Sequence, residues 1–242
     1  MMKNKKFQFK EFEVSHSKSA MKIGTDGVLL GAWTKIDENV NSVLDVGAGT
    51  GILALQMAQR SFAETIDAVE INPDAFEECV NNFENSPWGD RLYCYHASFT
   101  EFYSEIDDTY DLIISNPPFF AEHPDSELQN TSREQARFQE HLNFNDLLLG
   151  VSKLLSDHGE FSLILPFTEY KSFISIAEEF HLYPSSILYV KGQPSSPIKR
   201  TLLNFSRNKT EYISTEELII EYSRHQYTQE YVNLVKDFYL KM

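Results

Sequence analysis

The stretch DLIISNPPFF, Asp111–Phe120, joins an apolar β-branched run to an asparagine, two prolines and two aromatic residues. The prolines end a strand, because each fixes φ and removes a backbone donor. The Asn116 side-chain oxygen and the Pro117 carbonyl can accept both N–H groups of an exocyclic amine, while Phe119 offers a stacking face for a base. An amine held in this way points its lone pair at an electrophile. These three residues are the candidate catalytic groups, and Phe120 receives no role.

A glycine turn and an acidic residue supply a candidate site for the electrophile. In DVGAGTG the glycines Gly47, Gly49 and Gly51 lie between a predicted strand and a predicted helix, where backbone can approach a ligand closely. Their spacing departs from the dinucleotide-binding pattern G-x-G-x-x-G. Glu70 ends the next predicted strand about twenty residues later, where a carboxylate accepts hydrogen bonds from ribose hydroxyls. Asp45 has two interpretations: it contacts a ligand amino group, or it binds the amides of the turn.

These groups together favour methyl transfer from a sulfonium that is carried by an adenosine-containing cofactor. The sulfonium methyl is already electrophilic, so no metal is required. No strong base is required before transfer either, because the proton of the methylated amine leaves afterwards. The alternative is a strand that simply ends at a proline pair, with two packed phenylalanines behind it.

The composition is that of a globular protein. The chain has 242 residues, of which 42% are hydrophobic and 24% charged, and no apolar run approaches the ~18 residues of a membrane-spanning helix. The first residues, MMKNKKFQFKEF, lack the apolar stretch of a secretory signal. Cys79 and Cys94 have no metal-ligand spacing, so two reduced thiols are expected. We therefore expect a cytoplasmic protein with no metal site and no membrane partner.

Strand-like and helix-like stretches alternate along the chain. This alternation predicts an α/β fold with a mostly parallel, doubly wound sheet, and a closing pair of strands predicts an antiparallel edge strand. The predicted division is an N-terminal extension over residues 1–37 and one domain over residues 38–242. The predicted strands are 42–49, 65–71, 91–97, 110–115 and 160–166, with further runs in 185–192, 201–208 and 217–223; the predicted helices are 52–60, 72–83, 144–155, about 167–180 and 228–240.

The motifs DVGAGTG, AVEINP and ISNPPFF resemble those of class I adenosylmethionine-dependent methyltransferases that modify planar amino groups. The block FKEFEVSHSKSAMKIGTDGVLLGAW, with NSPW, SREQAR and a closing FYL, resembles the bacterial valine-tRNA adenine N6-methyltransferase family more narrowly, nearly from end to end. The resemblance implies a Rossmann-like sheet of seven strands, S-adenosyl-L-methionine as cofactor, and tRNA as partner. The implied reaction is methylation of the N6 amine of adenine 37 in the anticodon loop of valine tRNA.

The resemblance also implies roles for individual residues. It assigns cofactor contacts to the glycine turn and to the end of the NPPF strand, and it lays the MKIGTDG segment as a lid over the cofactor and target pocket. Many such enzymes have an acidic residue after the third strand that receives the cofactor's adenine amine, whereas this chain has Ser98 there. The implied cofactor-binding residues are Lys22, Gly24, Thr25, Asp26, Asp45, Gly47, Gly49, Gly51, Glu70, Ser98 and Asn116.

The net charge is unusual for a protein that binds nucleic acid. With 21 Lys and Arg against 36 Asp and Glu the chain has a formal charge of −15, which argues against nonspecific binding to phosphates. A local basic patch remains compatible with that total. The candidate RNA contacts are Arg133, Arg137, Lys199 and Arg200.

Other functions share the Asn-Pro-Pro corner. Enzymes that methylate DNA adenine usually carry a target-recognition domain, for which this chain has little room. Enzymes that methylate a protein glutamine usually add an N-terminal helical domain, whereas only about forty residues precede the first predicted sheet strand here. A third alternative is a noncatalytic module that binds RNA or adenosylmethionine. The intact Asn116–Phe119 corner argues against that alternative. The residues alone specify neither the tRNA position that is modified nor an oligomeric state.

Overall fold

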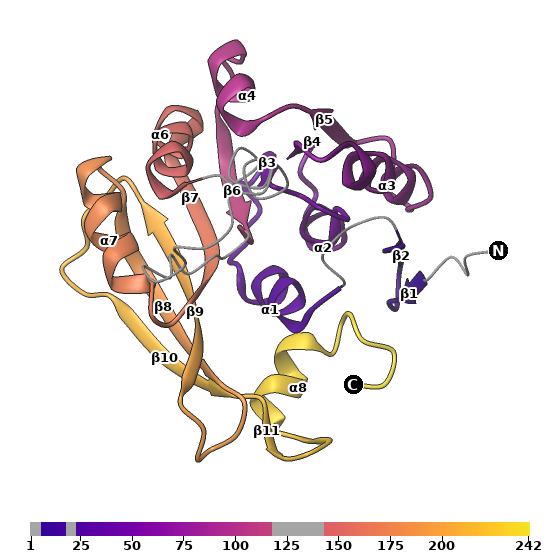
Figure 1. Cartoon of the computed structure of the whole chain (residues 1–242), viewed down its shortest axis with the longest axis vertical. Coiled ribbons are helices and arrows are strands. Elements are labelled where there is room, and N and C mark those ends of the chain that lie inside the picture. Colours follow the sequence, from indigo (N-terminus) through magenta and orange to yellow (C-terminus); the bar gives the residue numbers. More distant parts are fainter. Residues whose placement is uncertain (1–5, 18–22, 118–142) are drawn as a thin grey trace, which may run out of the picture.

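The computed structural model of the chain describes residues 6–17, 23–117 and 143–242. Its centre is an eight-stranded sheet with the order β10-β8-β9-β7-β6-β3-β4-β5. Helices cover both faces, with α1, α2 and α3 on one side and α4, α6 and α7 on the other (Figure 1). The sheet strands are β3 (Ser42–Val46), β4 (Thr65–Glu70), β5 (Leu92–His96), β6 (Tyr110–Ser115), β7 (Leu155–Pro166), β8 (Tyr183–Lys191), β9 (Ile198–Ser206) and β10 (Ser214–Ile219).

The helices follow the strands in the alternation that the sequence predicts. α2 spans the predicted residues, and α3 begins with the Asn72 side chain accepting the amide protons of Asp74 and Ala75, each at 3.1 Å. Pro73 occupies the first helical position, where its missing amide proton costs nothing. The helices are α1 (Thr25–Trp33), α2 (Ile52–Arg60), α3 (Pro73–Glu84), α4 (Phe99–Glu105), α6 (Phe144–Leu154), α7 (Tyr170–Glu179) and α8 (Gln229–Val235).

The predicted fold class is confirmed, and two details of the sheet differ from the prediction. The sheet has eight strands where seven were expected, because β10 pairs in parallel with β8 from Ser214 to Ile219. The antiparallel strand is β9, which lies between β7 and β8 and therefore two places in from the edge. Acidic residues Glu216 and Glu217 are exposed on β10, and charges of this kind discourage further pairing at a sheet edge.

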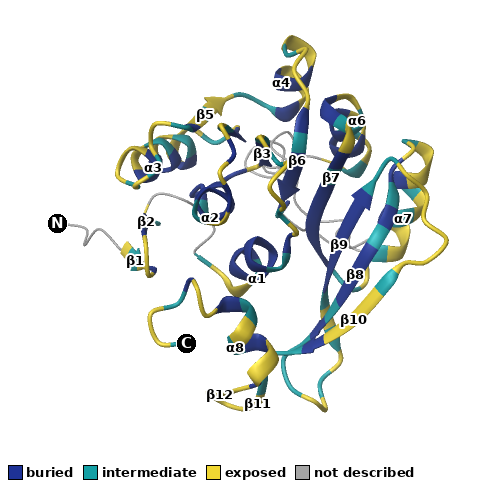
Figure 2. Cartoon of the chain, turned by 180° about the vertical axis from the view of Figure 1, so that it is seen from behind, coloured by how far each residue is buried: buried dark blue, intermediate teal, exposed yellow. Residues whose placement is uncertain are grey.

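Two hydrophobic cores lie on the two faces of the sheet. One contains buried side chains of α1, α2, α3 and α8, and the other contains those of α4, α6 and α7. Figure 2 shows the buried central strands between these helices, with exposed residues on the outer helix faces. Among the described residues, no helix is long and apolar enough to cross a membrane, and no cluster of three His, Cys, Asp or Glu side chains could hold a metal ion.

The N-terminal hairpin packs on the same core as α2 and α3. Its strands are β1 (Lys6–Gln8) and β2 (Glu13–Ser15), and Phe9 forms a β-bridge with Tyr239 near the C-terminus. A second small hairpin, β11 (Glu221–Ser223) and β12 (Gln226–Tyr227), follows β10. The extension over 1–37 as a separate unit stays a prediction.

Candidate active site

The carboxyl ends of three neighbouring strands lie side by side, at the edge of the sheet where the parallel strands end and not at its outermost strand. Val46 at the end of β3 lies beside Val69 of β4 and Ser115 of β6, all in parallel register. The residues that follow these positions are Gly47, Glu70 and Asn116, so the structure brings together the glycine turn, the acidic residue and the catalytic corner. In open α/β sheets this edge is where ligands bind.

The glycine turn is open at its first two glycines and packed at its third. Gly47, Gly49 and Gly51 have φ of 72°, 56° and 77°, a region that disfavours residues with a Cβ. A Cβ at Gly47 or Gly49 would meet no heavy atom within 4 Å, which leaves room for a ligand at the backbone. A Cβ at Gly51 would lie 2.5 Å from the Phe83 ring, so this glycine is needed for packing against α3.

Glu70 is held by two backbone amides. It is nearly buried, and its carboxylate oxygens accept hydrogen bonds from the amides of Gly49 at 2.7 Å and Asn72 at 2.8 Å. A carboxylate has about four lone-pair sites, so two remain for donors such as ribose hydroxyls. The bond to Gly49 also ties the orientation of this carboxylate to the glycine turn.

Asp45 supports the start of α2, and its predicted contact with a ligand stays a prediction. It is fully buried, and its Oδ2 accepts the amide proton of Ala54 in the first turn of α2 at 3.1 Å. Its Oδ1 is buried and has no hydrogen-bond partner among the described residues. Burial raises the pKa of Asp45 to about 7, the Ala54 amide opposes this shift, and the nearby Glu70 charge adds to it. One oxygen therefore supports the turn, and the other is available to a cationic ligand group.

Asn116 presents a second unpaired oxygen at the same edge. Its Oδ1 is buried without a partner in the part of the chain that the structure describes. The preceding residue is fixed, because Ser115 Oγ donates to the Val46 carbonyl at 2.8 Å. Pro117 is buried. Two unsatisfied oxygens beside an open glycine backbone fit a ligand with N–H donors, as the amino groups of adenosylmethionine and adenine would supply.

The start of α1 lies at this edge as well. Gly24 is the N-cap of α1 in an extended conformation, and Thr25 and Asp26 form the first turn. Asp26 Oδ2 accepts a hydrogen bond from Arg200 Nε at 2.7 Å, and Arg200 lies opposite Pro166 at the end of β7. A predicted cofactor residue and a predicted RNA contact are thus partners of each other. Four predicted site residues lie outside the described residues: Lys22, Phe119, Arg133 and Arg137.

Ser98 has a structural role in addition to the one predicted for it. It is the N-cap of α4, where its hydroxyl accepts from the Glu101 amide at 3.1 Å and its own amide donates to Glu101 Oε2 at 2.9 Å. This reciprocal arrangement is a capping box. One lone pair of the hydroxyl remains for a ligand, so a contact to the cofactor's adenine amine stays a prediction.

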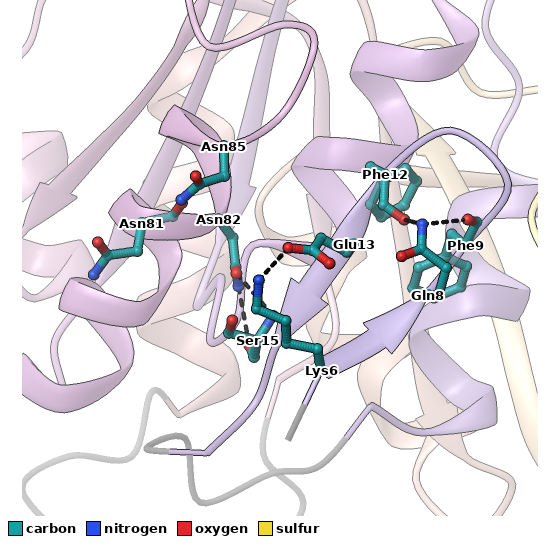
Figure 3. Close-up of polar contacts among 9 residues, drawn as sticks. All are labelled: Lys6, Gln8, Phe9, Phe12, Glu13, Ser15, Asn81, Asn82 and Asn85. Carbon is teal, nitrogen blue, oxygen red and sulfur yellow. Dashed lines mark hydrogen bonds and ion pairs between the residues drawn. The ribbon is translucent and has the colours of Figure 1, made fainter. Parts of the chain in front are cut away.

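Asn82 of α3 is a residue near the site that the sequence did not single out. Its side chain exchanges hydrogen bonds with the backbone of Ser15, and its Nδ2 also donates to the Thr50 carbonyl in the glycine turn at 2.9 Å. Figure 3 shows Asn82 pointing at Ser15. A buried asparagine within a helix gives no sequence signal for such a bridge, because its partners are distant backbone groups.

Comparisons with known proteins identify the family. The methyltransferase small domain model matches residues 7–153. Relatives named tRNA1(Val) (adenine(37)-N6)-methyltransferase from Flavobacterium johnsoniae and Flavobacterium psychrophilum are 54% and 52% identical to this chain, each match covering 98% of the chain and 100% of the relative.

A predicted O-methyltransferase from Agrobacterium tumefaciens has the same fold. Its TM-score is 0.68 at 19% identity, over 88% of this chain and 96% of the other. A putative RNA methyltransferase from Pyrococcus horikoshii has a TM-score of 0.51 at 22% identity, over 74% and 80% of the two chains. These matches show the fold alone. By its full-length identity to the curated relatives, the chain belongs to the tRNA1(Val) (adenine(37)-N6)-methyltransferase family.

Proposed function

We propose that this protein transfers a methyl group from S-adenosylmethionine to the N6 amine of adenine 37 in the anticodon loop of valine tRNA. The observation that carries the proposal is the buried, unpaired Asn116 oxygen beside the open glycine turn. The shared name of relatives at 40–54% identity supports the choice of substrate. The cofactor supplies an electrophilic methyl group on a cationic sulfonium.

The residues of the chain orient the reacting groups. The Asn116 carboxamide oxygen and the Pro117 carbonyl accept the two N6 hydrogens, which turns the nitrogen lone pair towards the methyl group. Glu70 accepts hydrogen bonds from the ribose hydroxyls of the cofactor. The free Asp45 oxygen receives the cofactor's amino group, and the open backbone at Gly47 and Gly49 lies against the cofactor. Phe119, which lies outside the described residues, stacks on the target adenine.

The RNA contacts and the lid are part of the same proposal. Lys199 is exposed at the start of β9, one residue before Arg200, which pairs with the last residue of β7. This exposed place near the site supports the proposal that Lys199 contacts a phosphate of the RNA. Residues 1–37 form the proposed cover of the pocket, and Arg133 and Arg137 are proposed contacts to the RNA. An unpaired loop base is splayed out at lower cost than a base in a duplex. We also propose a cytoplasmic location, because tRNA is found there.

The test maps the modified nucleotide. Valine tRNA from a strain without this gene should lack N6-methyladenosine at position 37 by mass spectrometry, and the gene supplied on a plasmid should restore it. Purified enzyme offered tRNA, DNA and protein together should label tRNA. Undiminished methylation in the deletion strain, or labelling of DNA or protein instead, would reject the proposal.

A further inference from the structure

We infer that Arg200 is a positioning residue for the cofactor site, not an RNA contact, and that it acts through Asp26 by fixing the start of α1. Only the measurement of KM for tRNA rests on the proposed function. The other readouts depend on the protein alone.

Arg200 is located where it can join α1 to the catalytic edge. On β9 it pairs with Pro166, the last residue of β7, and with Val190 near the end of β8. Its Nε donates to Asp26 Oδ2 at 2.7 Å, and its Nη1 donates to the Lys199 carbonyl at 3.1 Å. The side chains of Arg200 and Asp26 are 35% and 30% exposed, so the ion pair is partly shielded from water. The guanidinium is thus already engaged inside the protein.

The remainder of α1 is fixed by α2. Gly27 and Gly31 lie on one face of α1, and a Cβ at Gly27 would come within 3.3 Å of Ile52, the first residue of α2. At the other end of α1, Arg60 of α2 donates to the Thr34 carbonyl at 2.8 Å. Because Ile52 directly follows the glycine turn, this packing sets the first turn of α1 beside the cofactor site.

Besides the packing of Gly27 on Ile52, a polar contact to the sheet holds the first turn. Gly24 has no side chain, so the N-cap residue itself supplies no acceptor to the amides at the start of α1. Among the described residues, the Asp26–Arg200 ion pair joins this turn to the sheet. A partly exposed ion pair adds little to overall stability. Its effect is therefore local, on where the first turn of α1 lies relative to the glycine turn.

The experiment uses the full-length protein with Arg200→Ala, Arg200→Lys and the exchanged pair Asp26→Arg/Arg200→Asp. Hydrogen exchange of residues 23–33 is the primary readout, and calorimetric affinity for S-adenosylhomocysteine is the second. Arg200→Ala should speed exchange and weaken affinity about five- to tenfold, and Arg200→Lys should recover part of both. The exchanged pair should restore slow exchange. The melting temperature should change by no more than about 4 °C.

A matched ion pair at the same edge provides the control. Lys191 and Glu217 pair at 2.9 Å between β8 and β10, away from α1. Lys191→Ala should leave the exchange of residues 23–33 and the cofactor affinity unchanged. Lys199→Ala should raise the KM for tRNA without changing cofactor affinity.

Two outcomes would overturn the inference. One is that Arg200→Ala raises only the KM for tRNA and leaves exchange and cofactor affinity unchanged, which would make Arg200 an RNA contact. The other is that the exchanged pair leaves exchange as fast as in Arg200→Ala. A wild-type enzyme that binds S-adenosylhomocysteine but methylates no tRNA would reject the proposed function instead, and the exchange data would still decide the role of Arg200.

Discussion

At the end of β6, the Asn116 oxygen is buried without a partner among residues 6–17, 23–117 and 143–242, and such an unpaired group costs the folded protein free energy. Asn116→Ala removes this oxygen together with its cost. We expect the free energy of unfolding to stay the same or to rise, while kcat falls at least about 100-fold because the amine is no longer oriented. Thermal unfolding and single-turnover methylation measure the two effects separately. Affinity for S-adenosylhomocysteine should remain close to that of the wild type.

Asn204 is a matched control for this substitution. It is also a buried asparagine, but its Oδ1 accepts from Ser162 at 2.7 Å and its Nδ2 donates to Glu160 and Ser185. Asn204→Ala should cost about 1–3 kcal/mol of stability, because it leaves buried polar groups unpaired. If Asn116→Ala is destabilised as much as Asn204→Ala and loses cofactor binding as well, Asn116 has a folding role.

The raised pKa of Asp45 predicts that cofactor binding depends on pH. Burial raises its pKa to about 7, so the free protein holds a proton there at pH 6. A cationic amino group at the free oxygen favours the ionised form, and binding should therefore release this proton. Affinity for S-adenosylhomocysteine should rise with pH up to about 7 and then level off. Calorimetry in buffers of different ionisation enthalpy counts the protons, and Asp45→Asn should release fewer. Equal release by both proteins would contradict this role.

The raised pKa of the same carboxyl group also predicts how the free energy of unfolding changes with pH. Its folded-state pKa lies above its unfolded-state value, so the folded protein binds the extra proton between about pH 4 and pH 7. The stability that this proton contributes is present at low pH and is lost as the pH rises to about 7. Relative to Asp45→Asn, the wild type should lose up to about 1.4 kcal/mol per pH unit across this range. Chemical denaturation at several pH values measures the difference, and a rise with pH would contradict it.

At the scale of elements, the N-terminal hairpin and the glycine turn are joined by one side chain. Asn82 bonds Ser15 of β2 and Thr50 of the turn, so its loss frees three backbone groups. Asn82→Ala should cost about 1–3 kcal/mol and weaken the binding of S-adenosylhomocysteine. Denaturant unfolding and calorimetry measure the two changes.

The neighbouring Asn81 is the control for that substitution. It is exposed, and its side chain donates to the Glu77 carbonyl within α3. Asn81→Ala should change stability by no more than about 0.5 kcal/mol and leave cofactor binding unchanged. Equal effects of the two substitutions would mean that the bridge from α3 to the glycine turn does not matter.

The elements that sequence predicted best are those with strong local signals. α2 has apolar residues at helical spacing after a glycine turn, and α3 has Asn72 and Pro73 at its start, so their positions agree with the structure. The location of the cofactor site could be predicted from these strands, because the carboxyl ends of parallel strands lie side by side. The buried, unpaired oxygens at this edge depend on three-dimensional packing and have no signal in the sequence.

Other elements lacked such signals. α1 is apolar over most of its length, so periodicity gave no helical face, and it was expected as a lid segment. α4 is short, although the Ser98 and Glu101 capping box marks its start. The run expected over 217–223 overlaps β10 only at residues 217–219, because the strand begins at Ser214 and its polar first half is stabilised by pairing with β8.

For the whole molecule, the net charge of −15 restricts how tRNA can bind. An acidic protein repels RNA at long range, so affinity must depend on shape, stacking and a few local cations. The proposed phosphate contacts are Arg133, Arg137 and Lys199. Three such contacts predict that the logarithm of the association constant falls with the logarithm of salt concentration with a slope of about −2.

Filter binding of valine tRNA between 50 and 200 mM salt, roughly the range in which such slopes are measured, tests this prediction. Lys199→Ala should reduce the magnitude of the slope by about 0.7. Lys153 is the control cation, because it lies near the end of α6, just before β7 begins, and so at the opposite edge of the sheet. Lys153→Ala should leave the slope unchanged. A wild-type slope steeper than about −5 would mean that tRNA contacts an extended cationic surface, which must then include residues other than these three.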